Sequence, residues 1–322
     1  MPPPEFLTQY GLHRDPFELR ELNPLMRPSD GELLNEIVDC VPAYSELRRI
    51  DTYLRENAAG DEPLFLLVKG ADGCGRSSVA NWLLSRYCFH RGIDPAHFFV
   101  PKRSFGNNDG FGILKEWLGL LVDEIEDQAV QGPDVTEFWE RRKRATPDDV
   151  LPWRSLARNI ASQLGSVAGG PYGYGVCLED IGVPAVVDTA LTVFAKARTV
   201  CIFTVGDYEG EKKKVVSFFE SYQEPVKREV LRIGPLNGLD IRHLVHKRWD
   251  LVTNRTTQPP FPPDMELAWA DKQRPVKRVM FLISKLLQLK TTDYESKRWP
   301  HDTVLAFANQ EIEQKIKILD TI

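Results

Sequence analysis

A glycine-rich run between an apolar stretch and a helical pattern carries the strongest chemical signal in this sequence. The run GADGCGRSS, residues 70–78, follows LFLLV at residues 64–68 and precedes VANWLLSRY. It matches the phosphate-binding pattern G-x-x-x-x-G-K-[ST] except that Arg76 stands at the lysine position. Glycines let backbone N–H groups turn inward around a phosphate, and the following helix points its positive end at the same place. The alternative is a glycine-rich turn that serves packing alone.

Each part of this loop has an expected task. Backbone amides from Gly73 to Ser77 are expected to surround phosphate oxygens, and the Ser77 hydroxyl is expected to bind Mg²⁺. Arg76 keeps the positive charge of the usual lysine, but its planar group is bulkier and is not a compact point charge. The sequence therefore predicts nucleotide binding with slow hydrolysis or none. The loop residues predicted to bind nucleotide are Gly70, Gly73, Cys74, Gly75, Arg76, Ser77 and Ser78.

Composition limits the class of protein. With 322 residues, 42% of them hydrophobic, the chain can form one large domain and a smaller one. A net charge of −5 argues against a uniformly basic surface, so any nucleic-acid contact must be local. The five cysteines lie far apart, which favours neither a zinc site nor a disulfide framework. No targeting segment or membrane-spanning run is evident, and we expect a cytoplasmic protein.

The elements around the loop alternate between strand and helix. The strand that ends at the loop, the helix after it and a second strand at 97–103 form a β-α-β unit, which is the core of a parallel sheet. Further strands are predicted at 175–180, 199–207 and 228–234, with helices between them. This predicts an α/β fold, a P-loop NTPase parallel sheet sandwiched by helices (αβα), with a C-terminal helical lid. The predicted domains are an arm at 1–45, a core at 46–234 with an insertion at 128–170, and the lid at 235–322.

The order of these parts resembles the AAA+ class of P-loop ATPases and the related signalling ATPases over about residues 10–287. The opening YGLHRDPF resembles the short arm before the ATPase core in secretion- and transposition-linked AAA+ proteins of bacteria. In those proteins the arm often lies near the adenine. The resemblance therefore implies that Tyr10 and Phe17 contact the base, with ordinary packing as the alternative for Phe17.

The resemblance also implies an acidic pair and a polar sensor. Family members have Asp-Glu after a strand, where Asp orients the Mg²⁺ shell and Glu polarises water. This chain has the inverted pair Glu179-Asp180, so either carboxylate is a candidate for catalysis and Asp180 is a candidate metal ligand. A solvated strand end or a helix N-cap is the alternative. Thr204, or else Asp207, occupies the place of the sensor beside the γ-phosphate.

Two arginines complete the predicted site. Arg228, beside Lys227 before the fifth strand, corresponds in position to the family's arginine finger, which acts on a neighbouring subunit's nucleotide. Arg278 is preferred over Arg274 as the lid arginine that contacts the γ-phosphate. A solvated or salt-bridged surface residue is the alternative in each case.

The resemblance implies an AAA+-like protein that binds ATP or another nucleoside triphosphate with Mg²⁺ and hydrolyses it weakly or not at all. Nucleotide-dependent conformation or assembly would serve a protein partner, with a homo-oligomer expected and no membrane contact. One alternative is a pseudo-ATPase scaffold subunit. Another is a DNA-dependent ATPase of a transposition or phage-defence module, motivated by the arm and by basic runs at 141–144 and 212–214.

Overall fold

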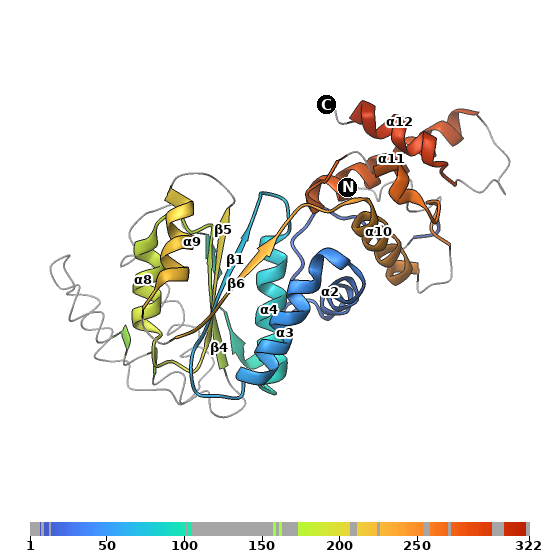
Figure 1. The fold of residues 1–322 in the computed structure, drawn as a ribbon. Helices are drawn as coiled ribbons and strands as arrows, with labels where there is room; N and C mark the ends of the chain where they lie inside the picture. Colours follow the sequence, from blue (N-terminus) through green and yellow to red (C-terminus); the bar gives the residue numbers. More distant parts are fainter. Residues whose placement is uncertain are drawn as a thin grey trace.

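A sheet whose neighbouring strands are all parallel forms the centre of the protein in this computed structural model (Figure 1). The structure describes residues 7, 10–12, 14–100, 102–104, 157–158, 161–162, 173–206, 211–223, 226–253, 258–269, 272–297 and 306–319. The strand order is β2-β4-β5-β1-β6, and β3 also pairs with β4. The strands are β1 (Leu64–Gly70), β2 (Phe98–Phe99), β3 (Lys102–Ser104), β4 (Gly173–Glu179), β5 (Val200–Gly206) and β6 (Lys227–Ile233).

Alternation along β1, which lies between β5 and β6, explains why both faces of the sheet are covered. Leu64, Leu66 and Val68 belong to the core on one face, whereas Phe65 and Leu67 belong to the core on the other. Because successive side chains of a strand point to opposite faces, an apolar run of this kind must be buried on both sides. The predicted α/β fold with a parallel sheet between helices is confirmed.

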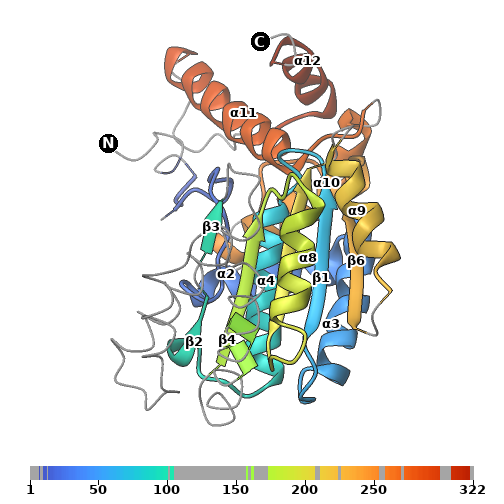
Figure 2. The same cartoon turned by 90° about the vertical axis from the view of Figure 1, so that its left-hand side faces the viewer.

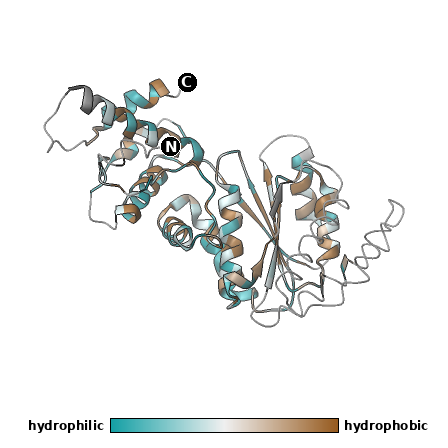
Figure 3. Cartoon of the chain, turned by 180° about the vertical axis from the view of Figure 1, so that it is seen from behind, coloured by the Kyte–Doolittle hydropathy of each residue, from teal (hydrophilic) through white to brown (hydrophobic). Residues whose placement is uncertain are grey.

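Helices cover the two faces in separate layers (Figures 1 and 2). The helices α3 and α4 lie on one face, and α8 and α9 lie on the other. Most helices carry both hydrophobic and hydrophilic residues (Figure 3). The core elements outside the sheet are η1 (Pro42–Tyr44), α3 (Ser45–Asn57), α4 (Arg76–His90), η2 (Pro95–His97), α8 (Pro184–Val193) and α9 (Glu211–Ser221).

A group of helices follows β6 and lies beyond one end of the sheet (Figure 1). We call these helices the lid: α10 (Gly238–Thr253), η4 (Met265–Trp269), α11 (Val276–Lys297) and α12 (Asn309–Leu319). Asn237 caps the start of α10, because its side-chain oxygen accepts a hydrogen bond from the Asp240 amide at 3.0 Å. An isolated bridge joins Leu236 to Arg274, so the entry to the lid is tied to the start of α11.

The segment before the core contains a helix that the sequence analysis did not predict. Helix α2 (Pro28–Cys40) begins with a proline in its first turn, where the missing N–H costs nothing. Its buried face includes Leu34, Ile37 and Val38, which recur at helical spacing. Helix α2 packs against α10 and α3, and the polypeptide between residues 14 and 27 crosses the start of α4. We call residues 14–27 the arm.

Some predictions fall outside the described residues. These are the insertion at 128–170 for all but four residues, the basic run at 141–144 and the alternative sensor Asp207. The boundaries at residues 45 and 234 stay predictions. In the part of the chain that the structure describes, no helix is long and apolar enough to cross a bilayer.

Candidate nucleotide-binding site

The glycine loop joins the carboxyl end of β1 to the amino end of α4, as the sequence predicted. Gly73 and Gly75 have φ angles of 78° and 91°, a region that side-chain-bearing residues rarely adopt. Gly75 is the N-cap of α4, and no side chain caps that helix end. The first turn of an α-helix leaves N–H groups without intrahelical partners. The loop therefore offers backbone donors and the positive end of the helix dipole to an anion.

Two glycines of the loop are required by close approach of other segments. A Cβ on Gly70 would lie 2.4 Å from the Ile233 carbonyl oxygen of β6. A Cβ on Gly73 would lie 3.1 Å from the Lys277 Cβ in the first turn of α11. The Lys277 amide donates to the Gly73 carbonyl oxygen at 2.9 Å. The loop is therefore held between the sheet and the lid.

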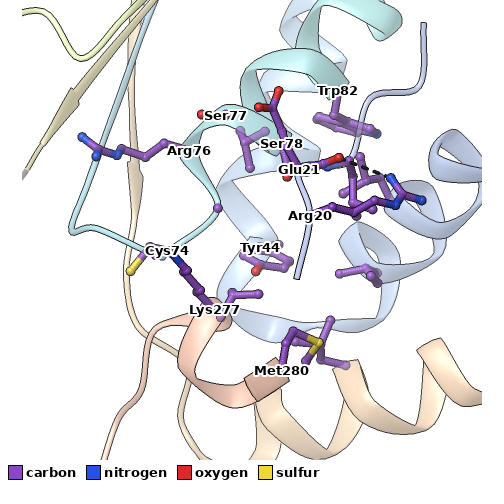
Figure 4. Close-up of a pocket in the computed structure, with 18 of the residues that line it drawn as sticks. Arg20, Glu21, Tyr44, Cys74, Arg76, Ser77, Ser78, Trp82, Lys277 and Met280 are labelled. Atoms are coloured by element: carbon purple, nitrogen blue, oxygen red, sulfur yellow. Dashed lines mark hydrogen bonds between the residues drawn. The ribbon is translucent and has the colours of Figure 1, made fainter. Parts of the chain in front are cut away.

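A cavity of about 380 Å³ opens beside this loop, within the size range of small-molecule sites (Figure 4). Its loop end consists of residues 73–79, the glycine loop and first turn of α4. The opposite wall, which we call the arm–lid end, comes from four places in the sequence. They are residues 18–22 of the arm, the apolar faces of α2 and α3 with Tyr44, Leu244 and Arg248 of α10, and Val276, Lys277 and Met280 of α11.

Hydrogen bonds fix the arm against the start of α4. The Leu22 amide donates to the Ser78 hydroxyl at 3.0 Å, and the Asn81 side-chain amide donates to the Leu22 carbonyl at 3.0 Å. Arg20 makes a two-pronged ion pair with Asp30 of α2, at 2.6 and 2.7 Å. Ser78, which the sequence assigned to nucleotide binding, therefore already accepts a hydrogen bond from the arm through its hydroxyl.

The side chain of Arg76 is engaged outside the cavity. Its guanidinium pairs with Asp72 at 2.6 Å and lies 3.6 Å from the Asp180 carboxylate. Figure 4 shows it pointing away from the other labelled side chains. Arg76 thus links the glycine loop to the acidic strand end that the sequence placed beside it, and a bound phosphate would compete with two carboxylates for this cation.

The acidic strand end is built around a hydrogen bond between neighbouring strands. Glu179 is the last residue of β4, and Asp180 follows it with a left-handed φ of 48°. The Asp180 amide donates to the Thr204 hydroxyl of β5 at 2.9 Å. The Asp180 carboxylate accepts from Lys212 of α9 at 2.6 Å. The structure thus brings Asp180, Thr204 and Arg76 together, and it adds Lys212, which sequence reasoning had not connected with the site.

The residues present fit Mg²⁺ held mainly by phosphate. Ser77 lines the cavity in the first turn of α4 and could supply a hydroxyl ligand, and Asp180 could supply a carboxylate. Within the described ranges no group of three His, Cys, Asp or Glu side chains could hold a metal by itself. A metal at Asp180 would have to share its carboxylate with Lys212 and Arg76.

The structure places two predicted residues away from the cavity. Phe17 is 1% exposed, and its ring packs edge-on against Phe261 in the lid. Arg278 donates to the Leu319 carbonyl of α12 at 2.6 Å and lies over the Phe281 ring. Neither of them lines the cavity. Their predicted contacts with base and γ-phosphate stay predictions that this arrangement does not support.

Arg228 and Arg274 also lie outside the cavity lining. Arg228 pairs in register with Phe65 near the start of β1, at the opposite end of the strands from the glycine loop. A finger for a neighbouring subunit would not need to reach the chain's own loop, so this position leaves that prediction open. Arg274 is buried over Trp269 and bridges to Leu236, which gives it a packing role.

The arm–lid end contains residues that sequence reasoning missed. Lys277, one position before the predicted Arg278, lines the cavity. Arg248 of α10 lines it too and is only 6% exposed. The signal for Lys277 was its place in the first turn after Pro275, where a side chain can face back over the loop. No local pattern marked Arg248, because its environment is made by α2, α11 and the arm.

Only comparison with solved structures found proteins similar to this chain. No family model matches the sequence, and no curated protein matches it. Two solved structures of the Aeropyrum pernix ORC2 protein are similar. The ADPNP-ADP complexes have a TM-score of 0.51 at 11% identity, over 94% of this chain and 71% of that chain, and the ADP form has 0.49 at 11%, over 84% and 66%. C. elegans PCH-2 gives 0.44 at 11% identity, over 90% and 74%.

The fold assignment rests on the first of these structures together with the glycine loop at the end of β1. Identity of 11% shows shared architecture and leaves residue roles open. The chain therefore has an α/β fold similar to that of this AAA+ structure, a parallel sheet between helices with a glycine loop after β1.

Proposed function

We propose that this protein binds a nucleoside triphosphate in the cavity beside the glycine loop. The carrying observation is that the uncapped amino end of α4 opens onto a cavity whose opposite wall comes from the arm and the lid. The loop end suits phosphates because it offers N–H donors and a helix dipole. The arm–lid end suits a base because it is largely apolar.

Nucleotide binding would couple the lid and the arm to the core. The lid contacts the loop through the Lys277 amide, and the arm contacts it through the Leu22 amide. A ligand between these segments interacts differently with open and closed arrangements, and that difference is what shifts a conformational equilibrium. The output of the protein would then be a change in lid position or in assembly that a protein partner recognises.

The ion pairs of Arg76 favour binding with little or no turnover. To assist phosphoryl transfer, the cation at this position must reach the transferring phosphate. In this structure Arg76 is instead paired with Asp72 and Asp180. Replacing it by lysine, Arg76→Lys, restores the usual loop residue, and we expect measurable or increased nucleotide hydrolysis. Unchanged turnover with unchanged binding would show that the loop residue is not what limits hydrolysis.

Calorimetric titration with Mg²⁺ and ATP or GTP tests the proposal. We expect stoichiometric binding by the wild-type protein. Arg76→Ala should weaken it, while the exposed Arg55→Ala in α3 removes the same charge away from the site and should leave it intact. Absence of binding by the wild-type protein, with its fold confirmed by circular dichroism, would contradict the proposed function.

A pseudo-ATPase scaffold is the second candidate. Lys212 on the Asp180 carboxylate favours it, because that contact places a protein cation on the predicted metal ligand. A scaffold would bind partners equally well with and without nucleotide. Partner capture that depends on added nucleotide would favour the first proposal.

The DNA-dependent alternative has less support in the described residues. Of its two basic runs, 141–144 lies outside them, and in 212–214 Lys212 is committed to Asp180. Nucleotide turnover stimulated by DNA, with a steep loss on adding salt, would support this alternative. Homo-oligomer formation, the protein partner and a cytoplasmic location likewise stay proposals.

A further inference from the structure

Arg248 is a buried cation whose hydrogen-bonding capacity is largely unused. It belongs to α10 and is 6% exposed. Its Nε has no hydrogen-bond partner among the described residues. Its Nη1 lies 2.6 Å from the sulfur of Met280, a weak acceptor. Burying a guanidinium without strong acceptors is costly, so a ligand that supplies acceptors here would be stabilised.

The groups around Arg248 do not satisfy it. Burial lowers the pKa of Arg248 to about 10, and the positive charge of Arg20 acts in the same direction. Asp15, Tyr44 and Asp30 oppose that shift by electrostatic attraction. Asp30 itself is occupied by the two-pronged pair with Arg20. Arg248 therefore remains a charged donor at neutral pH.

Arg248 stands at the arm–lid end of the cavity. It contacts Met280 of α11. Met280 lies about one helical turn after Lys277, whose amide donates to the Gly73 carbonyl of the glycine loop. Its neighbours in the wall include Leu34 and Leu244. A phosphate is better served by the N–H groups at the loop end, whereas a flat heterocycle fits between apolar side chains. The group that meets Arg248 is then the base.

We propose that Arg248 recognises the base of the bound nucleotide through O6 and N7, and that the site therefore prefers guanine to adenine. This inference rests on the proposed function, since it names the nucleotide that the same cavity takes. Guanine presents two adjacent acceptors, O6 and N7, which match the fork of a guanidinium. Adenine presents the N6 amino group beside N7, and that donor opposes the buried cation. A preference of about tenfold or more is expected from such a pair.

Calorimetric titration of four nucleotides into the wild-type protein with Mg²⁺ separates the contributions of the base acceptors O6 and N7. GTP and ITP share O6 and N7, and ITP lacks the 2-amino group, so we expect the two to bind about equally. ATP should bind about tenfold or more weakly. 7-Deaza-GTP, which lacks N7, should fall below GTP. This series needs no variant and so does not depend on whether a substituted protein folds.

A pair of variants then locates the preference. Arg248→Met keeps an unbranched apolar side chain in the wall and should bring GTP and ATP to similar affinities. Arg242→Met removes the same charge from the same helix at a residue paired with Glu266 and absent from the cavity lining, and should preserve the preference.

Three outcomes would overturn the inference. Wild-type protein that binds ATP as tightly as GTP or more tightly would exclude guanine recognition. Equal loss of both nucleotides in Arg248→Met would indicate a phosphate contact instead. Binding of no nucleotide at all would remove the proposed function and this inference with it, whereas the first two results leave nucleotide binding in place.

Discussion

The two ends of the cavity differ in how they are made. The loop end is one continuous segment, residues 73–79, whose backbone supplies the donors. The arm–lid end is assembled from the arm, α2, α3, α10 and α11, and side chains dominate it. A backbone site of the first kind can accept any nucleotide, because every nucleotide carries phosphates. Selectivity must come from the second kind.

The two ends also depend on different contacts. The loop end is held by β1, which pairs with β5 and β6 inside the sheet, and the Asp180 amide donates to Thr204 on the neighbouring strand β5. The arm–lid end relies on the Lys277–Gly73 hydrogen bond and on the Arg20–Asp30 pair, which join segments outside the sheet. We therefore expect that the arm–lid end can be loosened while the sheet stays folded, which the following variants test.

Gly73 is the residue at which the loop end contacts the lid. Of the substitutions considered, Gly73→Val should reduce nucleotide affinity the most. A side chain there must adopt the left-handed conformation and meets the Lys277 Cβ. We expect nucleotide affinity to fall about 100-fold or more, since the backbone of the loop and its contact with the lid are displaced together. Calorimetric titration measures it.

A matched control is Gly92→Val, which also has positive φ but no atom within 4 Å of an added Cβ. It should cost stability without the loss of affinity. Equal loss of affinity in both variants would mean that backbone strain, and not the contact between loop and lid, governs binding.

The substitution Arg20→Ala should loosen the arm–lid end while the loop end stays intact. The Asp30 side chain is 1% exposed, so removing its partner leaves a buried carboxylate. We expect the free energy of unfolding to fall by about 2–3 kcal/mol. Urea unfolding measures this change, and limited proteolysis should show faster cleavage in the arm while the sheet core persists. Loss of the sheet in step with the arm would contradict the distinction between the two ends.

The substitution Thr204→Val tests the hydrogen bond that lies next to the loop end. Valine keeps the shape of the side chain but removes the acceptor for the Asp180 amide, which should cost about 1 kcal/mol in unfolding free energy. Thr204→Ser keeps the hydroxyl that accepts this hydrogen bond, so it should lower the free energy of unfolding by less than Thr204→Val. If valine and serine behave alike, the hydrogen bond between β4 and β5 does not stabilise this strand end.

The smallest effect concerns pH at the arm. Burial acts to raise the pKa of Asp30, but the Arg20 hydrogen bonds, the Asn23 amide and the positive charges of Arg20 and Arg27 together outweigh it and hold that pKa below its ordinary value. A depressed folded-state pKa gives stability that is complete above about pH 4 and is lost as the pH falls through the folded value. The stability gap between wild type and Asp30→Asn should therefore narrow on acidification. A constant gap across urea titrations at several pH values would contradict this account.

Local sequence was enough to predict the loop end. The glycines, the apolar β1 and the first turn of α4 are contiguous, so their spacing alone indicated a strand, a turn and a helix start in that order. The alternating pattern of later strands and helices likewise predicted the parallel sheet. The acidic pair at residues 179–180 could be placed beside the loop because the carboxyl ends of parallel strands meet at one edge.

The arm–lid end could not be predicted in the same way. Helix α2 went unnoticed among prolines and polar turns, although Leu34, Ile37 and Val38 have helical spacing. Arg278 was chosen over Arg274, and Lys277, one residue before it, was not considered. Only the packing of α11 against α12 and the loop decides that Lys277 lines the cavity and that Arg278 does not. Adjacent residues on a helix point about 100° apart, so a small error in phase selects the wrong side chain.

The sequence by itself determined the strand–loop–helix unit and the parallel sheet, because backbone conformation there follows from glycines and from apolar periodicity within short segments. The tertiary structure alone decided that Arg76 pairs with Asp72 and Asp180, that the arm lies on Ser78, and that Arg248 is buried in the cavity wall. Apart from Asp72, the partners of those side chains lie far away in the sequence, so their orientation and unused donors depend on which segments pack together.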